Sequence, residues 1–158
     1  MLQRGANATP TISGDSKLLI PTMSSHNSPS GVISAVQNVN NAVRAFDGNF
    51  RQAYEYTGAK LGDYIMYTFE KPVKKITEWI VMTDAGVLGV VITLCAIYAV
   101  MTDGTEVEIG RFTEDYYTRI FRGTCDVSGQ IQAIKIMPLE FQNESGFNIY
   151  YANVVGVE

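Results

Sequence analysis

Residues 98–110, YAVMTDGTEVEIG, carry the clearest sign of local structure in this chain. The Asp103-Gly104 pair is typical of a two-residue hairpin turn, because the turn needs backbone angles that few other residues tolerate. After it, residues 106–109, EVEI, alternate charged and apolar side chains, as expected of a strand with one solvated face. This stretch therefore predicts an antiparallel β-hairpin.

Similar short strand-like runs, bounded by Gly, Pro, Asn and Asp, occur on both sides of the hairpin. They cover residues 32–35, 64–69, 76–82, 119–124, 130–137 and 148–157. Turn signals spaced roughly 10–15 residues apart are typical of an antiparallel sandwich. No stretch of about ten residues has a helical period. We therefore expect an all-β, jelly-roll-like sandwich, with Trp79 in its core.

Composition agrees with a single β-rich domain that does not bind nucleic acid. The chain has 158 residues, of which 46% are apolar and only 18% are charged. That length suits one domain, and a helical bundle would carry more Glu, Lys, Leu and Ala. The formal net charge of −4 argues against a nucleic-acid binder, which needs excess Lys and Arg to neutralise phosphates.

The uncharged run at residues 85–101, AGVLGVVITLCAIYAVM, is the one candidate for a membrane segment. It falls short of the ~20 residues that span a bilayer. It is also rich in Val, Ile and Thr, so we interpret it as buried strand. The first residues lack the apolar run of a signal peptide, so we expect no secretion by that route.

Residues 1–25 are rich in Ser, Thr, Asn, Gly and Pro, and we expect them to form an extended arm ahead of a sandwich at residues 26–158. The arm has one apolar cluster, at residues 18–20, LLI, which could dock on a partner. The two cysteines, Cys95 and Cys125, sit among apolar or β-branched neighbours. Two small buried thiols are favoured over a disulfide between them.

Candidates for catalysis are few. The single histidine, His26, lies in a Ser-rich stretch and is interpreted as a loop residue. Strand alternation places Glu106 and Glu108 on one solvated face, where charged side chains are ordinary. No nucleophile elbow, phosphate-binding loop or zinc-protease motif occurs. We therefore expect the chain not to be an enzyme.

Several motifs resemble those of the discoidin, or coagulation-factor type C, family of galactose-binding-like sandwiches. Residues 45–49, AFDGN, and residues 62–73, GDYIMYTFEKPV, are similar to a turn and the strand that follows it in that family. Residues 98–110, 133–138 and 151–157 are similar to a hairpin, the penultimate strand and the closing strand. The likeness covers residues 24–158 in the family's order. It implies a galactose-binding-like fold that carries a carbohydrate-binding type of function.

The resemblance also implies a candidate calcium site at the turn, since family members often hold a structural Ca²⁺ there. The matching groups are the carbonyls of Arg44 and Asn49, the Asp47 carboxylate, and the side chains of Gln52 and Asn153. Gln52 replaces the family's usual Thr and Asn153 its usual Glu, which leaves one charged ligand for an ion that prefers several hard oxygens. The alternative is that Asp47 and Asn49 only shape a turn.

Members of the family bind sugars, lipids or proteins through loops at one end of the sandwich. Sugar recognition needs an aromatic ring for the C–H face and amide or guanidinium groups for the hydroxyls. The candidates of these types are Tyr54, Tyr56, Tyr116, Tyr117, Arg119 and Asn143. For each of them, core packing or an ordinary loop position is the alternative.

Taken together, the sequence predicts a non-catalytic binding or assembly module. The first hypothesis is a structural subunit of a larger particle, such as a phage head, decoration or tail-fibre component. It would be made in the cytoplasm and attached to protein subunits through the arm. The alternative is a stand-alone carbohydrate-binding lectin or adhesin, or an accessory binding domain of a glycan-acting enzyme. No cofactor is required, and a structural Ca²⁺ is the one that the resemblance allows; the partners are glycans, protein subunits or both.

Overall fold

The computed structural model describes residues 15–83, 93–115, 117–141 and 146–158, with only the backbone described at residues 56, 57, 93, 146 and 147. The described elements are β1 (Lys17–Leu18), β2 (Val32–Ala35), the 3-10 helix η1 (Val39–Ala45), β3 (Tyr54–Thr57), β4 (Ile65–Met82), β5 (Thr93–Met101), β6 (Glu106–Thr113), β7 (Ile120–Phe141), β8 (Gly146–Ile149) and β9 (Tyr151–Val157). Hydrogen bonds join the strands in the order β1-β9-β4-β7-β5-β6, with β2 also on β4 and a separate β3-β8 pair. The pairing is antiparallel throughout, which confirms the predicted all-β sandwich.

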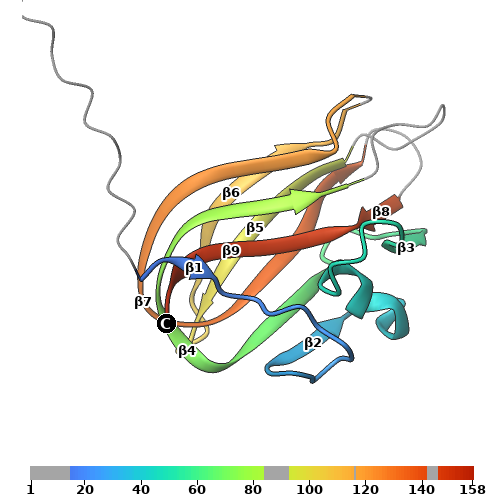
Figure 1. Cartoon of the computed structure of the whole chain (residues 1–158). Coiled ribbons are helices and arrows are strands. Elements are labelled where there is room, and N and C mark those ends of the chain that lie inside the picture. The colour runs from blue at the N-terminus through green and yellow to red at the C-terminus, as the bar shows by residue number, and fades with distance from the viewer. Residues whose placement is uncertain (1–14, 84–92, 116, 142–145) are drawn as a thin grey trace, which may run out of the picture.

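Two long strands, β4 and β7, curve through both layers of the sandwich (Figure 1). Residues 75–82 of β4 pair with β9 and with the first half of β7. Residues 65–68 of β4 pair with β2 and with the second half of β7, which continues to β5 and β6. The sequence suggested four separate strands here. The four predicted strands merge into the two strands β4 and β7, because the hydrogen-bonded pairing of β4 with β7 continues on both sides of its register shifts.

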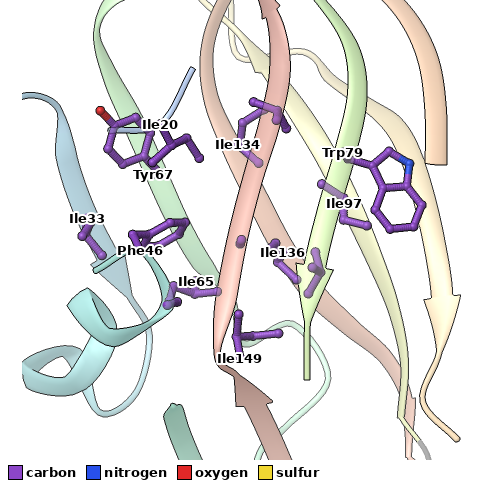
Figure 2. Packing of buried hydrophobic residues seen from close by; sticks show 14 of the residues in the cluster. Ile20, Ile33, Phe46, Ile65, Tyr67, Trp79, Ile97, Ile134, Ile136 and Ile149 are labelled. Atoms are coloured by element: carbon purple, nitrogen blue, oxygen red, sulfur yellow. The ribbon is translucent and has the colours of Figure 1, made fainter. Parts of the chain in front are cut away.

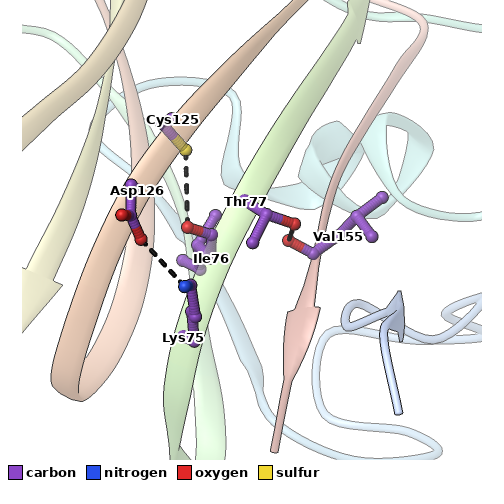
Figure 3. Close-up of polar contacts among 6 residues, drawn as sticks. All are labelled: Lys75, Ile76, Thr77, Cys125, Asp126 and Val155. Atoms are coloured by element: carbon purple, nitrogen blue, oxygen red, sulfur yellow. Dashed lines mark hydrogen bonds and ion pairs between the residues drawn. The ribbon is translucent and has the colours of Figure 1, made fainter. Parts of the chain in front are cut away.

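Within the half of β4 that pairs with β9, the register shifts between Ile76 and Glu78, and two side chains form hydrogen bonds with backbone carbonyls there (Figure 3). The Thr77 hydroxyl donates to the Val155 carbonyl at 3.3 Å, and the Cys125 thiol donates to the Ile76 carbonyl at 3.7 Å. A β-bulge of this kind bends a strand and increases its twist. The shift therefore bends β4 beside β9 and β7, and side chains supply donors to the Ile76 carbonyl of β4 and the Val155 carbonyl of β9.

The core between the layers is aliphatic, with aromatic rings at both ends (Figure 2). Trp79 is 6% exposed, so its predicted core position is confirmed. Its indole stacks at 28° on Phe112 and lies over two glycines, Gly110 and Gly123. A Cβ at Gly110 would overlap the indole nitrogen, so the ring fits only because these positions have no side chain.

The hairpin predicted from residues 98–110 is confirmed as the β5–β6 pair. The Asp103 carboxylate accepts the Thr105 N–H at 2.8 Å, and Gly104 takes the left-handed angle φ +87° that the turn requires. The uncharged run becomes strand from Thr93 onward, and its part at residues 84–92 lies outside the described residues. Within the part of the chain that the structure describes, no helix is long and apolar enough to cross a membrane.

The described residues at the end of the expected arm, up to residue 25, pack on the sandwich. Strand β1 pairs with β9, and Leu19, Ile20 and Met23 are all at most 6% exposed. Burying these side chains within the chain's own core removes apolar surface from water. The cluster that we expected to dock on a partner therefore lies mostly inside, with Leu18 alone of its three residues exposed.

Both cysteines are free. Cys95 is fully buried in β5, and Cys125 is partly buried at the bend of β7. Burial raises the pKa of both thiols, that of Cys125 to about 11. The two-thiol interpretation therefore matches the structure.

Candidate functional site

Backbone hydrogen bonds tie together the strand ends at one end of the sandwich. At the end of β4, the Thr83 N–H donates to the Arg119 carbonyl at 2.8 Å, just before β7 begins. The Tyr150 N–H, between β8 and β9, donates to the Met82 carbonyl at 2.8 Å. The same end carries the β3–β8 pair (Figure 1). Segments near residues 55, 83, 118 and 150 therefore lie at the same end of the sandwich, which we call the loop end.

Two predicted residues are exposed at this end. The Tyr117 side chain is 92% exposed, and the Arg119 guanidinium lies 5.8 Å from the centre of the Tyr150 ring. The Asp115 carboxylate fixes the turn by accepting the backbone N–H groups of Tyr117 at 2.7 Å and Thr118 at 2.5 Å. Hydrogen bonds to the Asp115 carboxylate lower its pKa, and the bond from the Thr118 side chain contributes most to this shift. The Arg119 guanidinium and the Tyr150 ring thus lie together, and the exposed Tyr117 side chain belongs to the same short segment as Arg119.

The other predicted ligand residues are placed differently. Tyr54 is fully buried, and its hydroxyl donates to the Gln37 carbonyl at 2.8 Å. Because its ring is not accessible to a ligand, Tyr54 is no longer a candidate ligand-binding residue. Burial also raises the pKa of this phenol. Tyr56 pairs in register with Phe147 of β8, and its side chain lies outside the described part. Tyr116 and Asn143 lie wholly outside the described residues.

The turn at residues 47–52 is held by its own polar groups. The Asp47 carboxylate accepts the Asn49 N–H at 2.8 Å, and the Asn49 side-chain oxygen accepts the Arg51 N–H at 3.2 Å. The Asn49 carbonyl accepts the Gln52 N–H at 3.2 Å. These are the bonds by which Asp and Asn shape turns, and they match the turn interpretation.

The Asn153 side chain is committed elsewhere. Its amide oxygen accepts the N–H groups of Ile20 at 3.0 Å and Val154 at 2.8 Å, and its NH₂ donates to the Ile20 carbonyl at 2.8 Å and to the Tyr151 hydroxyl at 3.0 Å. Both lone pairs of that oxygen are therefore used. Among the described residues, no group of three or more His, Cys, Asp or Glu side chains gathers to hold a metal. The residues present do not fit the calcium site that the resemblance implies.

The acidic pair on β6 lies on an exposed face, as expected, and both carboxylates also pair with cations. Glu106 forms an ion pair with Lys135 of β7, and Glu108 accepts two hydrogen bonds from Arg111 at 2.6 and 2.8 Å. The Arg111 hydrogen bond lowers the pKa of Glu108. The Glu106–Lys135 pair joins β6 to β7, whereas the Glu108–Arg111 pair lies within β6 itself.

Sequence reasoning missed an apolar hollow on the outer face of the sheet formed by β9, β4 and β7. Its volume is about 290 Å³, and it is lined by Phe50, Ile80, Met82, Ile120 and Tyr151. We call these five residues the apolar hollow. The Phe50 and Tyr151 rings meet edge to face at 5.3 Å and 78°. The sequence does indicate an apolar outer face here, because all four residues of the run 79–82, WIVM, are apolar, although side chains alternate between the two faces of a strand.

The fold matches solved structures of two kinds. A family 32 carbohydrate-binding module from C. perfringens NanJ, in complex with galactose, has 19% identity and a TM-score of 0.64, over 80% of this chain and 93% of its own. The corresponding module of AlyQ, in complex with 4,5-unsaturated mannuronic acid, has 14% identity and a TM-score of 0.62, over 78% and 92%.

An F5/8 type C domain from Bacteroides fragilis has 12% identity and a TM-score of 0.65, over 92% of this chain and 99% of its own. No protein-family profile matches the sequence, and no curated protein is detectably similar to it. Because the resemblance noted in the sequence and these structures agree, the chain has the galactose-binding-like β-sandwich fold shared by family 32 carbohydrate-binding modules and F5/8 type C (discoidin) domains.

Proposed function

We propose that this chain is a carbohydrate-binding module whose loop end recognises a glycan. The observation that carries the proposal is the exposed Arg119 guanidinium over the half-buried Tyr150 ring, with the exposed Tyr117 side chain two residues before Arg119. Aromatic faces stack on the C–H face of a pyranose, and guanidinium N–H groups donate to its hydroxyls. Support also comes from the NanJ and AlyQ modules, which share the fold and hold galactose and a mannuronic acid derivative.

The proposal covers a free-standing lectin and an accessory domain of a glycan-acting enzyme alike, because both bind glycan through the same surface. A subunit of a larger particle has less support. That hypothesis depended on an arm whose apolar cluster docks on a partner, and Leu19 and Ile20 of that cluster pack in the sandwich's own core.

The test is a glycan array probed with the wild-type chain and with Arg119→Ala, each in calcium and in chelator. We expect wild-type binding to a related group of sugars, unaffected by chelator, because the turn does not fit calcium. Arg119→Ala should lose about tenfold in affinity, which is the value of one charge-assisted hydrogen bond.

The matched control is Arg111→Ala, which removes an exposed guanidinium from β6 and should leave sugar affinity unchanged. A blank array from folded wild-type protein would overturn the proposal. So would equal losses of affinity in the two arginine variants.

A further inference from the structure

We propose that the apolar hollow seats an aromatic aglycone, so that the preferred ligand is an aryl glycoside whose sugar is held at the loop end. The inference rests on the proposed carbohydrate-binding function and names the ligand class of that same site. The hollow has a lining that suits an aromatic ring, and it lies one residue along the chain from Arg119 and Tyr150.

The terminal row of the sheet forms the floor of the hollow. Met82, the last residue of β4, lies opposite Ile120, the first residue of β7, and Tyr151, the first residue of β9. Directly opposed residues of antiparallel strands share a face, so these three side chains lie side by side. Val81, the neighbour of Met82 in β4, is buried in the core, which places the row on the outer face.

The hollow and the proposed sugar site meet at the ends of these strands. Arg119 directly precedes Ile120. Tyr150 likewise precedes Tyr151, so in each segment the two sites are one residue apart, about 3.8 Å between Cα atoms. The Tyr150 N–H donates to the Met82 carbonyl at 2.8 Å, which ties the two rows together. Successive side chains point to opposite faces of a strand, so a ligand reaches both sites over the strand ends, with its sugar beside Arg119 and its aglycone in the hollow.

The lining of the hollow suits an apolar group rather than a second sugar. The surface that lines it is entirely apolar, so it offers no partner to sugar hydroxyls. Phe50 is 53% exposed and Ile120 is 48% exposed, so a group that enters covers apolar surface that is open to water in the free protein. An apolar cavity of about 150 Å³ holds one benzene molecule, so a hollow of about 290 Å³ has room for one aromatic ring.

Three of the lining side chains favour an aromatic ring over a saturated one. The Phe50 and Tyr151 rings meet at 78° with their centres 5.3 Å apart. A third ring placed in the angle between them can stack on one and meet the other edge to face, which are the arrangements that aromatic pairs prefer. The Met82 thioether adds a polarisable sulfur, which makes favourable contacts with aromatic rings.

The experiment measures the affinities of the whole chain for methyl, cyclohexyl and phenyl β-galactoside by calorimetry, with the same three glycosides of another sugar where the array selects one. We expect the phenyl glycoside to bind about tenfold or more tightly than the methyl glycoside, because an apolar ring leaves water. It should bind about two- to tenfold more tightly than the cyclohexyl glycoside, because of the aromatic contacts.

One variant assigns the gain to the hollow. Ile120→Asn should lose the advantage of the phenyl glycoside and keep the wild-type affinity for the methyl glycoside. The matched control is Val32→Asn, which changes another β-branched residue at the start of a strand, 51% exposed against 48% for Ile120, and should leave all three affinities unchanged. In the wild type, the ring current of the phenyl glycoside should shift the methyl proton signals of Ile80, Met82 and Ile120, a readout that needs no variant.

The outcomes separate this inference from the proposed function. Equal affinities for the methyl and phenyl glycosides would leave the function standing and overturn the aglycone site. An undiminished phenyl advantage in Ile120→Asn would also overturn it, and a cyclohexyl glycoside bound as tightly as the phenyl one would overturn the aromatic class. So would a self-association abolished by Ile120→Asn in a chain without the phenyl preference, because the hollow would then be a contact between copies. Failure of every sugar to bind would remove the function itself, and the inference with it.

Discussion

Replacing Asn153 by alanine should destabilise the sandwich, because this amide holds the described N-terminal segment against β9. Its side chain accepts the Ile20 N–H at 3.0 Å and donates to the Ile20 carbonyl at 2.8 Å. Asn153 is 6% exposed and Ile20 is 3% exposed, so both backbone groups of Ile20 would lose a partner away from water. At about 1–3 kcal/mol for each of the two buried polar groups left without a partner, the free energy of unfolding should fall by about 2–6 kcal/mol. That is a large share of a typical total of about 5–15 kcal/mol.

The assay is urea unfolding followed by the fluorescence of Trp79, the single tryptophan, which lies opposite Val154 in the β4–β9 register. Amide hydrogen exchange at Ile20 reports the same change locally, as faster exchange in the variant. The control is Asn49→Ala. Its side-chain oxygen accepts one N–H at 3.2 Å in an exposed turn, so its effect should stay below about 1 kcal/mol. An Asn153→Ala effect as small as that of the control would refute the reasoning.

A second variant at the same position separates this role from metal binding. In Asn153→Asp the carboxylate can still accept the Ile20 N–H, but it cannot donate to the Ile20 carbonyl and it places a negative charge beside that oxygen. We expect destabilisation that added calcium does not reverse. If calcium restored the stability of this variant or raised that of the wild type, Asn153 would face a metal site after all.

Two further predictions concern the core and the bend of β7. Gly110→Ala would place a Cβ against the Trp79 indole, so it should lower the free energy of unfolding by about 1–3 kcal/mol and shift the tryptophan emission. The control, Ser128→Ala on the exposed part of β7, should change neither quantity. An unshifted emission spectrum in Gly110→Ala would contradict the packing described here. Burial raises the pKa of Cys125 from 9.0 to about 11, so the stability contributed by its neutral thiol is complete below pH 9 and is lost as the pH rises to 11. Between pH 9 and pH 11, the urea concentration at the unfolding midpoint should therefore fall less in Cys125→Ala than in the wild type. Equal declines in the two proteins would show that the thiol does not contribute to the pH dependence of stability.

Local chemistry was enough to predict the fold class and the best-defined hairpin. The Asp103-Gly104 turn needs only angles that its own residues permit, and the alternation at residues 106–109 sets which face of β6 is buried. The alternating motifs around it also predicted the core position of Trp79. The short helix η1 escaped notice because seven residues in a 3-10 helix show no 3.6-residue period.

The candidate site could be predicted only in part. The exposed positions of Tyr117 and Arg119 follow from their place in a polar stretch between strands. The burial of Tyr54 does not, because a tyrosine next to a turn can face either way until its neighbours are known. In the structure its hydroxyl meets the carbonyl of Gln37, which is 17 positions earlier in the chain.

Tertiary structure alone decided the features that join distant residues. The bond between Asn153 and Ile20 spans 133 positions, and it is what turns an expected calcium ligand into a clamp on the N-terminal segment. The apolar hollow likewise collects residues from the turn after η1 and from β4, β7 and β9. Periodicity along one strand shows which of its side chains share a face, but only the pairing of strands determines which other strands those side chains meet.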